Sequence, residues 1–200
     1  MKMRSTANGI FMTYTENREF SQLTFTADKL PKGEYESCTF GQCNFSNSDL
    51  SAVSFIDCEF IDCNLSLATL SNTAFKNVQF RSCKMVGLHF ENCNPFLLEM
   101  HFDGCQLNLS SFYKLTLKKS RFNNCAMQEV DFSEADFTYS SFKECDLSGA
   151  IFDRTILEKT DFRTAFNYSI DPENNRLKKA RFSLTGVVGL LHKYNITIES

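Results

Sequence analysis

The sequence has no Trp and, among 200 residues, only 3 Pro and 8 Gly. No run of 18 apolar residues occurs, which excludes a membrane-spanning helix. Lys2 and Arg4 are not followed by an apolar run, so no secretory signal is expected. The formal net charge of −3 argues against a dedicated binder of nucleic acid or anionic membranes, since such proteins usually carry a basic face.

Phe and Cys are abundant instead, with 21 and 9 residues. A chain of this length does not need disulfide bonds. With no export signal and an odd number of Cys, we expect free thiols and a cytoplasmic location. No Cys-x-x-Cys pair is present, and none of the three His shares the positions of the Cys residues. The sequence therefore predicts small apolar core residues rather than a metal or redox site.

Large apolar residues recur at every fifth position from Phe20 to Phe90 and, two residues out of step, from Phe102 to Phe162. The interruption lies near residues 94–100. The residue two before each of these centres is small in most repeats, and every Cys falls there if Cys93 is counted in the first register. A period of five fits neither a helix nor a strand, so it predicts a chain that turns a corner every five residues.

A second period of twenty residues appears once the two-residue excess is closed. It places Phe at Phe20, Phe40, Phe60, Phe80, Phe102, Phe122, Phe142 and Phe162. It also places Cys at Cys43, Cys63, Cys83, Cys105, Cys125 and Cys145. Identity at twenty residues rather than five predicts four-sided coils that stack along one axis, with a ladder of Phe rings inside.

Residues 135–139 (ADFTY) and 145–149 (CDLSG) resemble the A(D/N)LXX motif of pentapeptide repeat proteins. The resemblance covers residues 18–166. It implies an all-β solenoid, namely a right-handed quadrilateral β-helix of about eight coils. Residues 1–17 would then form an N-terminal lead-in or cap, and residues 167–200 a C-terminal cap and dimerisation segment.

After Phe166 the repeat is lost, and an apolar stripe of helical spacing begins at Leu184. We expect Ser183 to cap a C-terminal helix, followed by a short strand at Ile196–Ile198. This tail is similar to the C-terminus of the Qnr-type quinolone-resistance members of the family, where it makes a homodimer. The resemblance thus implies a dimer interface at Leu184, Val187, Val188, Leu191, Tyr194, Ile196 and Ile198.

Nine acids and three bases lie between residues 129 and 161, whereas residues 114–121 form a short basic band. We therefore expect charge to be segregated by coil. The candidate partner-binding acids are Glu129, Asp131, Glu134, Asp136, Glu144, Asp146, Asp153 and Asp161, with Glu158 as the ninth acid. A solvated surface with incidental clustering is the alternative interpretation.

The Qnr-type resemblance implies that an acidic rod imitates DNA, binds DNA gyrase or topoisomerase IV, and lessens quinolone poisoning. This chain is more similar to the members without long loops, because its only excess is the two residues near 94–100. Two alternatives stay open: an interaction scaffold for an unknown cytosolic partner, and an immunity protein that shields gyrase from a natural toxin.

Catalytic and cofactor-binding motifs were not found in the sequence. We expect no enzyme activity, no catalytic residues, and neither a cofactor nor a metal. We likewise expect no small-molecule substrate, no direct contact with nucleic acid, and no membrane contact.

Overall fold

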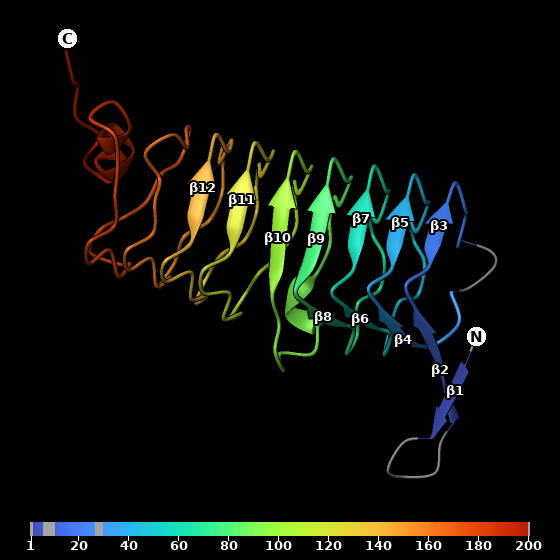
Figure 1. Cartoon of the computed structure of the whole chain (residues 1–200). Coiled ribbons are helices and arrows are strands. Elements are labelled where there is room, and N and C mark those ends of the chain that lie inside the picture. Colours follow the sequence, from blue (N-terminus) through green and yellow to red (C-terminus); the bar gives the residue numbers. More distant parts are fainter. Residues whose placement is uncertain (1, 6–10, 27–29, 200) are drawn as a thin grey trace.

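The computed structural model describes residues 2–5, 11–26 and 30–199. The chain winds into a rod of stacked layers with its two ends far apart (Figure 1). The strands are β1 (Lys2–Ser5), β2 (Phe11–Glu16), β3 (Glu19–Ser21), β4 (Gly33–Glu36), β5 (Thr39–Gly41), β6 (Ser54–Ile56), β7 (Glu59–Ile61), β8 (Ala74–Lys76), β9 (Val78–Arg81), β10 (Met100–Asp103), β11 (Arg121–Asn123) and β12 (Ser141–Lys143). The 3₁₀-helices are η1 (Phe90–Asn92), η2 (Gly186–Leu190) and η3 (His192–Tyr194).

Parallel pairing between coils defines four long sides of the rod. Face 1 holds β3, β5, β7, β9, β10, β11 and β12, paired in that order, and face 4 holds β2, β4, β6 and β8. Isolated bridges define face 2, as between Thr24 and Asn44, and face 3, as between Asp49 and Thr69. Partners are twenty residues apart, except where Phe80 pairs with Phe102. The predicted all-β, four-sided solenoid is therefore confirmed.

The number of layers is clearest on face 1. Six strand-to-strand steps lead from β3 to β12, and two isolated bridges extend the series to Asp161 and Arg181. In the described part of the chain, no helix is long and apolar enough to cross a membrane.

Phe side chains form a ladder along the axis of the rod. Ring centroids lie 4.8 Å apart for Phe20 and Phe40 and 5.4 Å apart for Phe162 and Phe182, with nearly parallel rings. The predicted members Phe40, Phe60, Phe80, Phe102, Phe122, Phe142 and Phe162 all belong to it. Each buried ring contributes about 1.5–3 kcal/mol by burial, and stacking adds to this. The ladder therefore holds neighbouring coils in register.

The corners depend on a left-handed residue two positions after each apolar centre. The φ angle is +52° at Gln42 and +56° at Asn47, for example. Asn and Gly adopt this conformation most readily, and Gly149 does so with φ of +67°. Each such residue turns the chain toward the next face and places its own side chain at an outer corner.

The small inward residue of each repeat also supplies a hydrogen-bond donor. The Ser140 and Thr160 hydroxyls donate to the carbonyls of Leu117 and Phe137 in the preceding coil, at 3.0 and 2.9 Å. The Cys63 thiol donates in the same way to the Phe40 carbonyl, at 3.2 Å between the heavy atoms. All nine Cys are buried and free. The repeat thus favours Ser, Thr and Cys for their donors as well as for their small volume.

The two-residue excess lies on face 4. Asn94 N–H donates to the Thr73 carbonyl at 2.9 Å, and Glu99 N–H donates to the Phe75 carbonyl at 3.0 Å. Both ends of the insertion therefore stay attached to the preceding coil. Between them Phe96 and Leu97 project, with 67% and 65% of their surface exposed.

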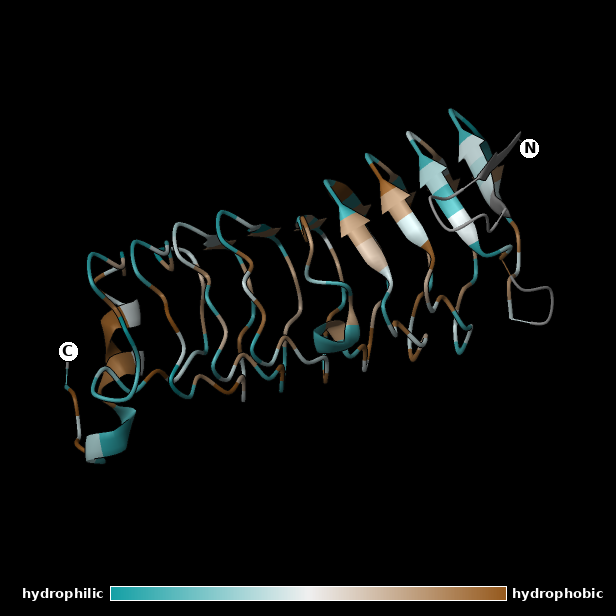
Figure 2. Cartoon of the chain, turned by 90° about the horizontal axis from the view of Figure 1, so that it is seen from below, coloured by the Kyte–Doolittle hydropathy of each residue, from teal (hydrophilic) through white to brown (hydrophobic). Residues whose placement is uncertain are grey.

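The C-terminal segment differs from the prediction of one helix and a strand. η2 and η3 are 3₁₀ turns, and Ile196–Ile198 forms no strand. A strand needs a neighbour, and no described residue pairs with these three. Figure 2 shows that the ribbon at the helical turns near the C-terminus is apolar.

Close packing explains the tight helical turns. A Cβ on Gly189 would lie 2.4 Å from the Tyr168 carbonyl oxygen, so only Gly fits there. Two Gly and the β-branched pair Val187 and Val188 also disfavour a regular α-helix. The predicted role of Ser183 is supported, because its Oγ accepts a hydrogen bond from Gly186 N–H at 3.0 Å.

At the N-terminal end, β1 pairs antiparallel with β2, and β2 pairs parallel with β4. Stacking on face 4 thus begins inside the range 1–17 that was predicted as a lead-in or cap. That range includes Met1 and residues 6–10, which lie outside the described residues. Ser200, in the predicted range 167–200, lies outside them as well.

Candidate functional site

The predicted acids are distributed over all four sides of the rod. Glu129 and Asp146 belong to face 2 and its outer corner, and Asp131 to face 3. The others follow from the same register, with Glu134 and Asp153 on face 3, Asp136 and Glu158 on face 4, and Glu144 and Asp161 on face 1. The structure therefore does not gather the nine carboxylates into one site.

Most of these acids form ion pairs, usually with bases from neighbouring coils. Glu134 lies between Lys114 and Arg154, with N to O distances of 3.6 and 3.0 Å. The other pairs are Asp136 with Lys118, Asp153 with Arg154, Glu158 with Arg176, Asp161 with Arg163 and Arg181, and Glu144 with Lys143. Several of these bases lie outside residues 129–161. Counting charge within that window therefore overstated its negative character.

The ion pairs also affect ionisation. A hydrogen bond from Arg154 lowers the pKa of Glu134, and one from Arg163 lowers the pKa of Asp161. Burial alone would raise the pKa of Asp136, but the Thr138 hydrogen bonds and the Lys118 ammonium outweigh it and lower the pKa. These carboxylates are ionised at neutral pH and largely neutralised by their partners.

Three acids form no ion pair within the described part of the chain: Glu129, Asp131 and Asp146. Asp131 Oδ1 accepts a hydrogen bond from Ser133 N–H at 2.8 Å. Asp146 Oδ2 accepts one from the Gln128 amide at 2.8 Å. We call these three residues the acidic side. They occupy two adjoining coils on faces 2 and 3.

Cations gather at the diagonally opposite corner, between faces 4 and 1. We call this set the basic ridge, and its members are Lys118, Lys119, Arg121, Lys159, Lys178, Lys179 and Arg181. The expected segregation of charge by coil is therefore wrong. Charge in the second half of the rod is separated by side, because residues twenty apart stack along the same line.

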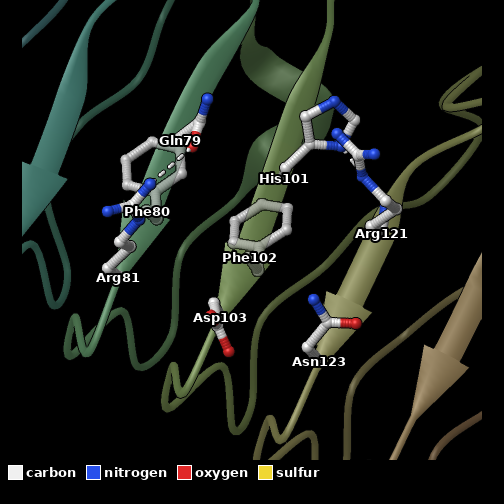
Figure 3. Close-up of a pocket in the computed structure, with 8 residues that line it drawn as sticks. All are labelled: Gln79, Phe80, Arg81, His101, Phe102, Asp103, Arg121 and Asn123. Atoms are coloured by element: carbon white, nitrogen blue, oxygen red, sulfur yellow. Dashed lines mark hydrogen bonds between the residues drawn. The ribbon is translucent and has the colours of Figure 1, made fainter.

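A hollow on face 1 spans β9, β10 and β11, and Figure 3 shows its lining residues. His101 is the titratable base there, with 15% of its side chain exposed. Its Nδ1 accepts a hydrogen bond from Arg121 N–H at 3.3 Å. Burial, followed by the charge of Arg121, lowers the pKa of His101. The hollow is lined by no Ser, Thr, Cys, Tyr or Lys, so it pairs this base with none of the usual nucleophiles.

The residues predicted for a dimer interface lie together at the C-terminal end. Leu184 is 91% exposed, and Val187, Val188, Tyr194, Ile196 and Ile198 are also exposed, while Leu191 is half-buried. Leu190 packs against the core instead. Among the described residues, no cluster of three or more His, Cys, Asp or Glu side chains could hold a metal ion.

A family model described as "Pentapeptide repeat region" matches residues 34–95 and 96–168. The chain belongs to the pentapeptide repeat family. Each of its two matched segments lies on one side of the insertion on face 4, so the family pattern continues across it.

Solved structures of other pentapeptide repeat proteins resemble this one. HetL, involved in heterocyst differentiation regulation in the cyanobacterium Nostoc sp. strain PCC 7120, matches with a TM-score of 0.55 and 14% identity, covering 86% of this chain and 87% of HetL. Trypsin-treated QnrB1, a plasmid-mediated fluoroquinolone resistance protein, matches with a TM-score of 0.47 and 20% identity, covering 92% and 99% of the two chains. Among curated proteins, none matches this sequence. At these identities the likeness to HetL establishes the fold alone.

Proposed function

We propose that this protein is a non-enzymatic, cytoplasmic binding rod whose acidic side occupies the basic DNA-binding groove of a type II topoisomerase, DNA gyrase or topoisomerase IV. The observation that carries the proposal is the acidic side itself. Glu129, Asp131 and Asp146 lie in adjoining coils of a regular scaffold without a cationic partner in the described structure. Fixed, unpaired carboxylates on a rod can bind the cations that otherwise hold DNA phosphates.

Supercoiling of relaxed plasmid by purified gyrase tests this proposal. The protein should inhibit supercoiling, or restore it in the presence of a quinolone, at micromolar concentration. The variant Glu129→Gln/Asp131→Asn/Asp146→Asn should lose the effect. Its amides keep the hydrogen-bond acceptors of the turns and remove only the charge.

A matched control changes net charge equally on other parts of the rod. Asp57→Asn/Asp62→Asn/Asp103→Asn removes three carboxylates from face 1 and its flanking corner, and it should behave as the unmodified protein. If both triple variants lose activity equally, general charge rather than the acidic side is responsible. If the unmodified protein neither inhibits nor protects, the topoisomerase proposal is wrong.

A scaffold for another cytosolic partner is the second candidate, favoured by the ion pairs that neutralise Glu134, Asp136 and Asp161. Paired carboxylates leave little net field for DNA mimicry. Inactivity in the gyrase assay would favour this function. The third candidate, immunity to a natural toxin, predicts relief from that toxin and not from quinolones.

We further propose that two copies associate through the exposed apolar surface at the C-terminal end. Leu184 and its apolar neighbours would bury against a second copy, and Ile196–Ile198 would gain the strand partner that it lacks. Exposed apolar residues gathered on one end of a rod are typical of an association surface.

A further inference from the structure

The basic ridge has no role in the proposed topoisomerase contact. Five of its cations, Lys119, Arg121, Lys159, Lys178 and Lys179, form no ion pair with any carboxylate in the described part of the chain. All five are exposed. Only Lys118 and Arg181 are paired, with Asp136 at 3.1 Å and Asp161 at 3.4 Å. The net charge of the whole chain therefore hides a local excess of positive charge.

The ridge is a regular structure rather than a chance cluster. Lys119, Tyr139, Lys159 and Lys179 stand at the same outer corner in four successive coils, each with φ between +58° and +64°. Backbone hydrogen bonds of 3.0 Å, from Lys119 N–H to the Thr138 carbonyl and from Lys159 N–H to the Lys178 carbonyl, lock these coils together. At about 4.8 Å per layer, the four side chains line up over roughly 15 Å.

The residue types at this corner are unusual for its backbone conformation. In the first half of the rod the same corner carries Asn17, Ser37, Asp57 and Asn77, all with positive φ. Short polar residues, Asn and Asp above all, tolerate left-handed φ better than Lys or Tyr do. The change to long cations and an aromatic ring therefore has a conformational cost, which a binding role for these side chains would explain.

Tyr139 adds an aromatic surface to the ridge. More than half of the residue, 55%, is exposed. The Lys159 ammonium lies 4.3 Å from the ring centroid and donates a hydrogen bond to the hydroxyl. This hydrogen bond, helped by the charge of Lys119 and Lys179, lowers the pKa of Tyr139. Cations flank an exposed ring, which is the combination that binds a phosphate backbone and an unpaired base.

We infer that the basic ridge binds single-stranded nucleic acid, with phosphates on Lys119, Lys159 and Lys179 and a base against Tyr139. The ridge is a convex corner one side chain wide, which suits a flexible strand better than a rigid duplex. An acidic peptide would use the lysines but not the exposed ring. The ridge and the acidic side share no residue, so the two proposals can fail separately.

Fluorescence anisotropy with a labelled oligothymidine of about ten nucleotides tests the inference at low salt. The variant Lys119→Glu/Lys159→Glu/Lys179→Glu should bind at least about tenfold more weakly. Its salt dependence should also be shallower by about 2 in the log–log slope, since each lost phosphate contact on a single strand removes about 0.7. The matched control Lys76→Glu/Lys84→Glu/Lys143→Glu changes net charge equally outside the ridge and should bind about as the unmodified protein does.

Tyr139→Leu separates stacking from charge. It should weaken oligothymidine binding about fivefold or more, since stacking on one aromatic ring contributes about 1–3 kcal/mol, and should leave binding of an abasic oligonucleotide unchanged. Equal loss of binding in the ridge and control variants would overturn the inference. So would equally tight binding of duplex DNA, or displacement by polyglutamate at equal charge with no effect of Tyr139→Leu, which would instead indicate an acidic protein partner.

Discussion

The two halves of the rod, before and after the insertion at residues 94–99, share one Phe ladder but differ on face 4. In the first half this face forms the strands β4, β6 and β8, and each of the first two is followed by a Cys at the corner. In the second half it forms only isolated bridges, such as Thr116 with Asp136. There the corner closes into a tight turn, because Ser140 N–H donates to the Phe137 carbonyl at 2.9 Å. The corner residue thus influences whether a side of the coil becomes a strand or a turn.

The surface charge of the same edge also reverses between the halves. Three outward positions per coil can be matched along the edge between faces 4 and 1 through the twenty-residue register. From 16 to 79 they hold five acids and one base, namely Glu16, Glu19, Glu36, Asp57, Glu59 and Lys76. From 118 to 181 they hold the seven bases of the basic ridge and two acids, Glu158 and Asp161. A constant core therefore leaves the outward positions free to serve different partners.

The largest expected effect comes from breaking the shared ladder. Phe122→Asp should abolish folding, because it buries a carboxylate without a partner among stacked rings. If the halves form one cooperative unit across the insertion, Phe60→Asp should unfold the second half as completely as Phe122→Asp does. Circular dichroism with amide hydrogen exchange measures both. Phe96→Asp, at an exposed position, is the control and should fold normally, whereas a folded Phe122→Asp rod would contradict the axial ladder.

The next effect concerns the end of the second half. Leu184→Glu/Val188→Glu places charges on exposed side chains, so folding should be kept while the proposed dimer is lost. Light scattering should give twice the chain mass for the unmodified protein and the chain mass for the variant. Leu67→Glu/Leu109→Glu, at two exposed apolar residues on the side of the rod, is the matched control and should stay dimeric. A dimeric Leu184→Glu/Val188→Glu protein would place the interface elsewhere.

The periods of five and twenty residues predicted the solenoid and its ladder, because every inward position must fit a constant cross-section. They also contained the signal for the ion pairs, which the count of acids within residues 129–161 missed. Lys114, Glu134 and Arg154 are spaced by twenty, and so are Asp161 and Arg181. Reading charge along the twenty-residue register would have found both these pairs and the basic ridge.

The C-terminal turns could not be predicted in the same way. An apolar stripe of helical spacing indicated an α-helix, but it does not report the contact of Gly189 with Tyr168, which is distant in sequence. The stripe also did not show which residues face the core. Leu190 packs inward while Leu184 and Val188 face outward, since the 3₁₀ turn rotates successive side chains by a larger angle than an α-helix does.

A smaller effect tests the closed corners of the second half. Ser140→Ala removes the hydroxyl that donates to Leu117 and accepts from Ser120 N–H, leaving two buried backbone groups without that partner. We expect a loss of about 1–3 kcal/mol in the free energy of unfolding. Ser133→Ala, on the outward side of the same coil, should change it by less than about 0.5 kcal/mol. Urea unfolding compares the two, and equal losses would show that the inward hydroxyl contributes nothing special.

The smallest effect concerns the ion pairs of the second half. The folded-state pKa of Asp136 is lowered, so its charge stabilises the fold above the unfolded pKa of about 3.9, and this stability is lost as pH falls through the folded value. Asp136→Asn keeps the acceptor for Thr138 and removes only the attraction to Lys118. It should reduce the free energy of unfolding by about 0.5–1 kcal/mol between pH 5 and 7, and by nothing near pH 2. Asp103→Asn, which breaks no ion pair in the described structure, should show no such dependence. A difference that persists at low pH would assign the stabilisation to the hydrogen bonds of the turn rather than to charge.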